Sequence, residues 1–224
     1  DFAKSMIKFM KDEYGVDPVY EAQAGEKETD FRSFLLKAKA ANPDAIVLSG
    51  LVDETVRALK QSYEVGIPKS VARVANSVAS KVEVPTNAGK AAVGVTYAAA
   101  FAASDKRPIA KKFVKKIKDK YGVVPGHDFS QMQDLLDMLR PALESAQLKF
   151  SGDLAADRNQ VRDSIAGITN FTGLASGPIG FCAAGSPECR DGNKTPVMIE
   201  YTKGGKNWKT KVAGTVTFNP SAGL

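Results

Sequence analysis

Helical patterns and short apolar runs alternate along the first hundred residues, and this alternation is the feature that most limits how the chain can fold. The run AIVLSG, residues 45–50, is continuously apolar and bounded by turn residues, as is typical of a strand covered on both faces. Strands separated by helices pair in parallel. The sequence therefore predicts an α/β protein with a doubly wound parallel sheet, with helices over 1–14, 30–42 and 53–65 and strands over 18–24, 45–50, 70–76 and 91–101.

Three helical patterns end in nearly the same phrase. DEYGVDP (12–18), SYEVGIP (62–68) and DKYGVVP (119–125) each place a glycine after an aromatic turn and a proline shortly beyond it. Glycine accepts the left-handed conformation that closes a helix, and proline prevents its continuation. We predict that the helices end at these glycines.

The second half of the chain changes character. Helices are predicted over 107–121, 129–146 and 157–168, and two strands within 195–212 are joined at Gly204 and Gly205. Few strands accompany these helices. We therefore expect that a large part of the working protein is absent from this sequence.

Composition excludes several classes of protein. The longest apolar stretch, 91–103, is interrupted by polar residues and falls short of the roughly 20 apolar residues that a bilayer needs, so no membrane span is predicted. The formal charge of +6 is modest. Its densest patch, KKFVKKIKDKYG (111–122), has no aromatic side chain interleaved with the lysines, which favours a solvated helix face over a nucleic-acid site.

Motifs for catalysis are weak. AQAGEKETDF (22–31) lacks the Walker spacing, and it is better explained as a helix start capped by Thr29 or Asp30. His127 is the only histidine, which argues against a triad or a multi-histidine metal site. Asp53 and Glu54 suit the first turn of a helix better than catalysis. We predict no catalytic residue, cofactor or metal.

The two cysteines, Cys182 and Cys189, lie in FCAAGSPECRDG with six residues between them. The spacing is neither a CxxC redox motif nor part of a zinc pattern. A structural disulfide is favoured over free thiols, which would place the protein outside the reducing cytosol.

Ligands of open parallel sheets bind at the carboxyl ends of the strands. After residues 45–50 come Leu51 and Val52, which offer an apolar wall, and at the end of residues 70–76 come Asn76 and then Ser77, which offer hydrogen bonds. These residues predict a site for a small, partly apolar ligand. The alternative, that Asn76 and Ser77 only cap the following turn, remains open.

An ordered set of segments resembles a known family. AGEKETDFRSFLLKAKAANPDAIVLSG followed by ETVRALKQSYEVGIP is similar to the second lobe of type I periplasmic binding proteins, especially the branched-chain amino-acid (Leu/Ile/Val) binding group of ABC importers. AGKAAVGVTYAAAF, KKFVKKIKDKYGVVP and ITNFTGLASGPIGF continue the likeness almost to the end of the chain.

The resemblance implies two doubly wound lobes joined by three crossovers. Residues 1–99 and 195–224 would form most of one lobe, and residues 100–194 would add helices to the other. The sheet of the first lobe and the first strand of the second have no counterpart here, so the chain would correspond to the C-terminal two-thirds of such a protein.

The family's pocket carries over with changes. Leu51 and Val52 stand where an aromatic residue commonly meets the ligand, and Ala75, Asn76 and Ser77 stand where amino-acid binders place a carboxylate. Gln133 lies where a further aromatic residue is usual. The resemblance implies an amino acid as ligand, and these departures from the amino-acid binders leave room for an aromatic carboxylate, an amide or another small organic solute.

We therefore predict a solute-binding protein of an ABC importer, periplasmic or anchored outside the cell, which closes on a small solute, binds a membrane permease and no nucleic acid, and is a monomer. Two alternatives are a doubly wound nucleotide-dependent enzyme and the sensory domain of a receptor or regulator. The sequence upstream would discriminate among these three functions. A signal peptide would favour the importer, a P-loop the enzyme, and an attached output domain the sensor.

Overall fold

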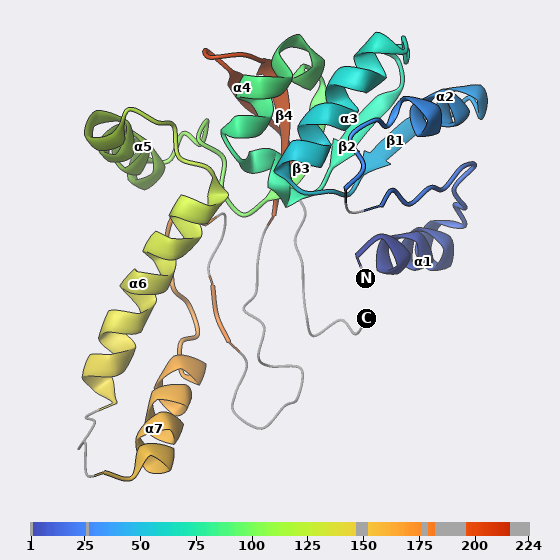
Figure 1. Cartoon of the computed structure of the whole chain (residues 1–224). Coiled ribbons are helices and arrows are strands. Elements are labelled where there is room, and N and C mark those ends of the chain that lie inside the picture. The colour runs from blue at the N-terminus through green and yellow to red at the C-terminus, as the bar shows by residue number, and fades with distance from the viewer. Residues whose placement is uncertain (1, 26, 147–151, 176–178, 182–195, 216–224) are drawn as a thin grey trace. The chain divides into compact units, whose positions relative to one another are not determined.

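The chain forms two compact units, which we describe separately (Figure 1). The computed structural model describes residues 2–25, 27–146, 152–175, 179–181 and 196–215. The first unit comprises Asp1–Ala98 and Ile199–Lys211, and the second comprises Ala99–Met198 and Val212–Leu224.

A five-stranded sheet with the order β1-β2-β3-β4-β5 confirms the predicted α/β architecture. The strands are β1 (Ala45–Leu48), β2 (Ala72–Ala75), β3 (Val95–Ala99), β4 (Val197–Lys203) and β5 (Lys209–Thr215). Strands β1, β2 and β3 pair in parallel, with Ala45 opposite Ala72 and Arg73 opposite Val95. Their carboxyl ends therefore lie at one edge of the sheet, followed by the loops in which we predict the ligand site.

The helices of the first unit follow the predicted pattern: α1 (Phe2–Tyr14), α2 (Arg32–Ala40), α3 (Val52–Glu64), α4 (Glu83–Ala88) and the 3-10 turns η1 (Ser77–Ser80) and η2 (Gly89–Ala92). Helix α3 is the most deeply packed, and Leu59 is fully buried in the core with Val84 and Val95. The predicted helix ends are confirmed, because Gly15, Gly66 and Gly122 all have positive φ.

The prediction of a strand over residues 18–24 is wrong. This segment is irregular, and Val19 is 68% exposed. A strand requires a neighbour for its backbone N–H and C=O groups. In the described part of the chain β1 pairs only with β2, and residues 18–24 pair with no strand, so they form none.

Buried aromatic rings tie β3 to β4. The Tyr97 and Tyr201 rings lie 5.2 Å apart, Trp208 packs edge-on against Tyr201, and the Tyr201 hydroxyl donates to the carbonyl of Ala79. Burial raises the pKa of Tyr97 to about 12 and raises the pKa of Tyr201 as well. Both phenols therefore remain protonated at neutral pH and act as packing and hydrogen-bonding groups.

The turn after β4 approaches η2 so closely that only glycine fits at position 204. A Cβ on Gly204 would lie 1.8 Å from the carbonyl oxygen of Gly89. We expect Gly204→Ala to lower the free energy of unfolding by about 1–3 kcal/mol, because the backbone must shift to relieve the overlap. Urea unfolding followed by fluorescence of the single tryptophan, Trp208, measures this directly.

Gly214→Ala on β5 is the matched control, because nothing lies within 4 Å of the Cβ that it would add. Equal stability of the two variants would show that the turn does not depend on this contact.

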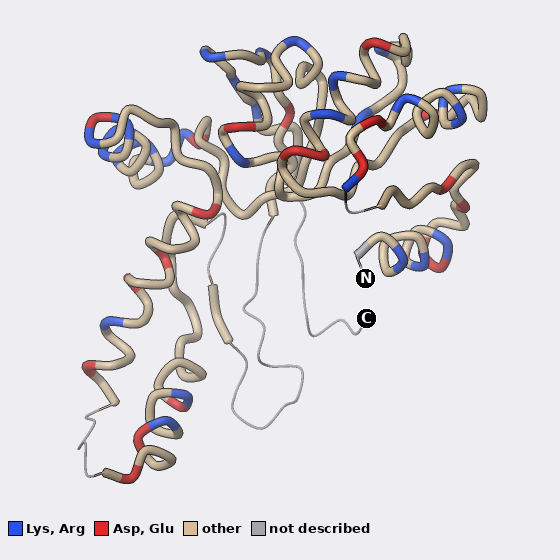
Figure 2. Tube along the Cα trace, viewed as in Figure 1, with Lys and Arg blue, Asp and Glu red and all other residues tan. Residues whose placement is uncertain are grey.

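The second unit contains three longer helices, α5 (Pro108–Tyr121), α6 (His127–Ser145) and α7 (Leu154–Ala166), whose two ends lie within three residues of the predicted ones. Helix α7 begins three residues early because the Asp153 carboxylate accepts hydrogen bonds from the amides of Ala155 and Ala156. Lysines gather on α5 (Figure 2). On its buried side, Phe113 packs in a cluster with Phe101 and Leu174. No helix among the described residues is long and apolar enough to cross a membrane.

Two charged side chains hold the segment Gly173–Ala175 in the second unit. The Asp134 carboxylate on α6, 2% exposed, accepts hydrogen bonds from the amides of Leu174 (2.6 Å) and Ala175 (2.7 Å). Arg107 donates to the carbonyls of Gly173 and Leu174. This clamp fixes a segment that lies far from α6 in the sequence.

Candidate functional site

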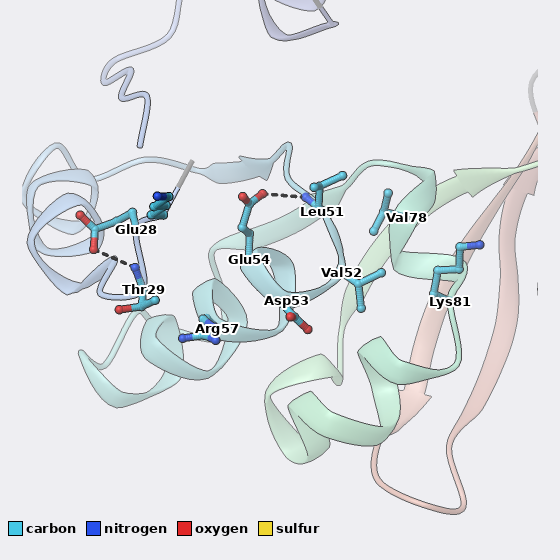
Figure 3. Close-up of a pocket in the computed structure, with 10 residues that line it drawn as sticks. Glu28, Thr29, Leu51, Val52, Asp53, Glu54, Arg57, Val78 and Lys81 are labelled. Carbon is cyan, nitrogen blue, oxygen red and sulfur yellow. Dashed lines mark hydrogen bonds between the residues drawn. The ribbon is translucent and has the colours of Figure 1, made fainter. Parts of the chain in front are cut away.

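A hollow of about 570 Å³ opens in the first unit beside the carboxyl end of β1 (Figure 3). Three stretches of chain line it: residues 27–29 before α2, residues 51–54 with Arg57 at the start of α3, and Val78 and Lys81 after β2. This is the edge at which the parallel strands end, where open α/β sheets place their ligands.

Apolar side chains form one part of the lining. Figure 3 shows Leu51, Val52 and Val78 grouped together, and Leu51 is 71% exposed. The position of Leu51 is fixed by its backbone, since its amide donates to the Glu54 carboxylate at 2.8 Å. Glu54 thus stabilises the start of α3 as predicted, and Leu51 presents its side chain to the hollow.

Charged groups complete the lining. Asp53 and Arg57 lie one helical turn apart on the exposed side of α3, and Lys27 and Lys81 come from neighbouring loops. Arg57 makes no hydrogen bond or ion pair with any residue that the structure describes. The hollow therefore combines an apolar wall with a cation available for a carboxylate or another acceptor.

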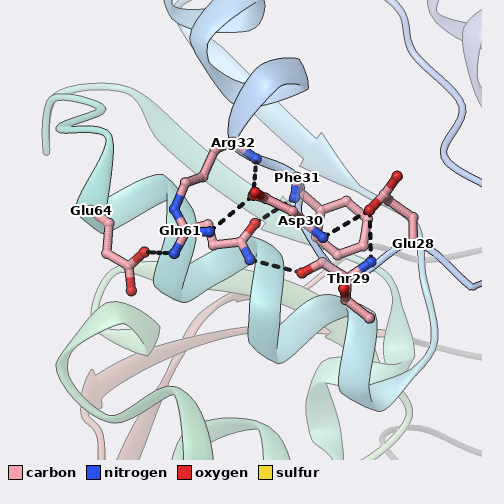
Figure 4. A network of polar contacts seen from close by, with 7 residues as sticks. All are labelled: Glu28, Thr29, Asp30, Phe31, Arg32, Gln61 and Glu64. Carbon is pink, nitrogen blue, oxygen red and sulfur yellow. Dashed lines mark hydrogen bonds and ion pairs between the residues drawn. The ribbon is translucent and has the colours of Figure 1, made fainter.

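A network of hydrogen bonds shapes the loop before α2 (Figure 4). Gln61 on α3 is 7% exposed; its Oε1 accepts from the Phe31 amide at 2.5 Å, and its Nε2 donates to the Thr29 carbonyl at 2.9 Å. The Glu28 carboxylate accepts from the amides of Thr29 and Asp30. The loop that contributes Glu28 and Thr29 to the hollow is thus anchored to α3.

This network settles the role of the glycine, lysine and threonine before α2. The amides of Thr29, Asp30 and Phe31 are occupied by Glu28 and Gln61, so they form no phosphate cradle. The helix begins at Arg32, two residues later than predicted, and the Asp30 carboxylate accepts a hydrogen bond from the backbone amide of Arg32. That hydrogen bond lowers the pKa of Asp30, and Arg32 also pairs with Glu64.

Asn76 and Ser77 lie beside the hollow rather than in its lining. Asn76 Nδ2 donates to the carbonyl of Gly50 at 3.1 Å, while its Oδ1 is buried without a hydrogen-bond partner in the described structure. No side chain caps η1, which begins at the exposed Ser77. Asn76 connects the loop after β1 to the loop after β2, and ligand contact by either residue stays a prediction.

The remaining predicted residues lie elsewhere. Gln133 is on α6 in the second unit, where its Nε2 donates to Asp137 at 2.9 Å. Cys182 and Cys189 lie outside the described residues, so their disulfide stays a prediction.

Sequence reasoning missed Arg57, Val78, Lys81 and the pair Glu28 and Thr29. Arg57 follows Asp53 by four residues, so helical spacing alone places it on the same side of α3 as the predicted loop. Glu28 and Thr29 had no comparable signal, because only the long-range bonds to Gln61 bring their loop to α3.

A family model described as "Periplasmic binding protein" matches residues 2–188. Among curated proteins, none matches the chain.

Solved structures share the fold. A leucine-binding protein from Thermotoga maritima has 26% sequence identity and a TM-score of 0.71 over 88% of this chain and 51% of its own. A branched-chain amino-acid transporter substrate-binding protein from Streptococcus pneumoniae, in complex with isoleucine, has 22% identity and a TM-score of 0.78 over 97% and 57%. An ABC transporter solute-binding protein from R. palustris, in complex with benzoate, has 16% identity and a TM-score of 0.74 over 96% and 55%. The chain thus spans slightly more than half the length of these structures.

Proposed function

The chain belongs to the periplasmic binding protein family, and we propose that it is part of the solute-binding protein of an ABC importer, with the hollow beside β1 as one half of its ligand site. The protein performs no chemistry in this role. Its solute is delivered to a membrane permease, which places the protein in the periplasm or at the outer side of the membrane.

The observation that carries this proposal is the lining of the hollow. Leu51, Val52 and Val78 form an apolar wall beside the guanidinium of Arg57. Such a combination suits a small molecule with an apolar body and a carboxylate or amide, because the apolar part is removed from water while the polar part is paired. Relatives of this fold were solved with isoleucine and with benzoate, which both have this character.

We propose that residues 1–99 and 195–224 belong to one lobe of such a protein and residues 100–194 to the other. The two units differ from this division only at Ala99, at residues 195–198 and at residues 212–224, which all fall in the second unit. Bound solute would stabilise a closed arrangement of the lobes, which the permease recognises. Exposed apolar side chains on α6, including Met132 (57%) and Leu136 (59%), support this assignment, because a surface of this kind is normally covered.

Replacing the exposed leucine of the hollow tests the site. We expect Leu51→Asp to weaken solute binding by about 10- to 100-fold, because burying a leucine contributes about 1.5–3 kcal/mol. A thermal-shift screen of the full-length protein against isoleucine, leucine, benzoate and benzamide finds the solute, and calorimetry of both proteins measures the difference.

Leu36→Asp on α2 is the matched control, since Leu36 is also exposed (51%) but does not line the hollow. Equal weakening by both changes would contradict the assignment of this hollow. A melting-temperature increase with ATP alone, and with none of the organic solutes, would overturn the importer function in favour of a nucleotide-dependent protein.

A further inference from the structure

Helix α5 concentrates most of the chain's excess positive charge. Its 14 residues hold six lysines and one aspartate, which leaves the helix at +5 against +6 for the whole chain. All six lysines are exposed, and Figure 2 shows the lysines of α5 close together on one short helix. Helix α5 thus has charges almost all of one sign, whereas the hollow in the first unit is lined by both acidic and basic side chains.

Packing fixes the direction of the lysine face. Ala110 and Phe113 are buried, and Val114 and Ile117 pack against the same cluster with Phe101 and Leu174. At 100° per residue the lysines occupy the opposite side of the helix, so they point to solvent. Most of the apolar side is used inside the unit, and the large exposed apolar side chains of α5 are Ile109 and Tyr121 near its two ends, so the lysine face between them presents mainly charge.

Little of this charge is neutralised locally. Lys115 pairs with Asp119, and Lys120 lies over the Tyr121 ring at 5.2 Å. The other four lysines, Lys111, Lys112, Lys116 and Lys118, make no ion pair with any described residue. Lysines held side by side without acidic partners repel one another, and a surface of opposite charge would relieve that repulsion.

We propose that the lysine face of α5, defined by Lys111, Lys112, Lys115, Lys116, Lys118 and Lys120, is a docking surface for anionic phospholipid headgroups. Clustered lysines bind anionic membranes through many weak contacts, and the attraction ends within about a Debye length. A protein partner fits less well, since lysine is depleted at protein interfaces, where aromatic residues and arginine dominate. Nucleic acid fits less well too, because Tyr121 at the helix end is the only exposed aromatic residue on α5.

The test is cosedimentation of the full chain with vesicles. We expect the protein to sediment with vesicles of phosphatidylglycerol and phosphatidylcholine in equal parts, and to stay in solution with phosphatidylcholine alone. Binding should vanish near 1 M salt, where the Debye length is about 3 Å. The variant K111Q/K112Q/K116Q should bind the anionic vesicles at least tenfold more weakly.

The matched control is K4Q/K8Q/K11Q on α1, which removes the same charge from a helix whose Lys8 and Lys11 are paired with Asp12 and Asp17. It should bind within about twofold of the unchanged protein. Equal loss in the two variants, undiminished binding when α5 is changed, or no binding to anionic vesicles would overturn the proposal. Displacement by inorganic phosphate at the lipid's phosphate concentration would also overturn it, since free phosphate would then be the ligand. Solute binding, measured separately, should be unchanged in both variants.

Discussion

Replacement of Asp134 by alanine is expected to lower the free energy of unfolding of the second unit by about 3–5 kcal/mol. The buried carboxylate accepts two hydrogen bonds from the amides of Leu174 and Ala175. Hydrogen bonds to charged groups contribute about 1.5–3 kcal/mol each, and alanine leaves both amides buried without an acceptor. Urea unfolding followed by helical circular dichroism measures the loss. Fluorescence of Trp208 would not measure it, because that residue reports on the first unit.

Asp137→Ala is the matched control, one turn along the same helix, where the carboxylate is exposed and pairs only with Gln133 in the described structure. Its effect should stay within about 0.5 kcal/mol. Hydrogen exchange localises the defect, since the amides of Leu174 and Ala175 should exchange faster in Asp134→Ala alone. Unchanged exchange at these two amides would contradict the clamp, whatever the global stability.

Gln61→Leu is expected to lower stability by about 2–4 kcal/mol and to weaken solute binding at least tenfold. The substitution keeps the side-chain volume on α3 and removes both hydrogen bonds to the loop before α2, from the Phe31 amide and to the Thr29 carbonyl. Both groups are partly buried, and a fully buried backbone group left unpaired costs about 1–3 kcal/mol, so the expected loss lies toward the lower part of the sum for two such groups. The loop carries part of the lining of the hollow, so its displacement changes the site as well as the fold.

The matched control is Lys60→Leu, which places a leucine one residue before Gln61 on α3. Lys60 is exposed and makes no hydrogen bond to the loop before α2, so this variant shows what a leucine on the helix does by itself. Urea unfolding measured by Trp208 fluorescence gives stability, and calorimetry with the solute from the screen gives affinity. Lost stability with unchanged affinity would mean that the loop shapes the fold but not the solute site. Unchanged stability would contradict the anchoring role of Gln61.

Local patterns predicted most elements of the fold correctly. The aromatic, glycine and proline phrases placed helix ends at Gly15, Gly66 and Gly122, because a positive φ depends on the residue itself. The apolar run at residues 45–50 also placed β1, but the expected cover on both faces is wrong, because Ala45 and Val47 are exposed and β1 is an edge strand of the described sheet. The first turn of α3 with Asp53 and Glu54 also follows from neighbouring residues alone.

The errors arose where distant residues decide the outcome. Residues 18–24 have the composition of a strand, but a strand needs a neighbour that local sequence cannot supply. Ligand contact by Asn76 stays a prediction, but its hydrogen bond to the carbonyl of Gly50, 26 residues away, had no local signal. Val78 was missed because only the folded sheet brings α3 and the loop after β2 to one hollow, whereas the helical spacing from Asp53 could have indicated Arg57.

The sequence by itself determined the α/β class, the helix ends and the family, because these depend on short patterns and on their order along the chain. Only the tertiary structure decided which side chains meet. Gln61 reaches the loop before α2, Asp134 reaches Leu174 and Ala175, and Leu51 joins Val78 in one lining, all through contacts between segments far apart in sequence. Such contacts depend on the register and packing of whole elements, which no local pattern encodes.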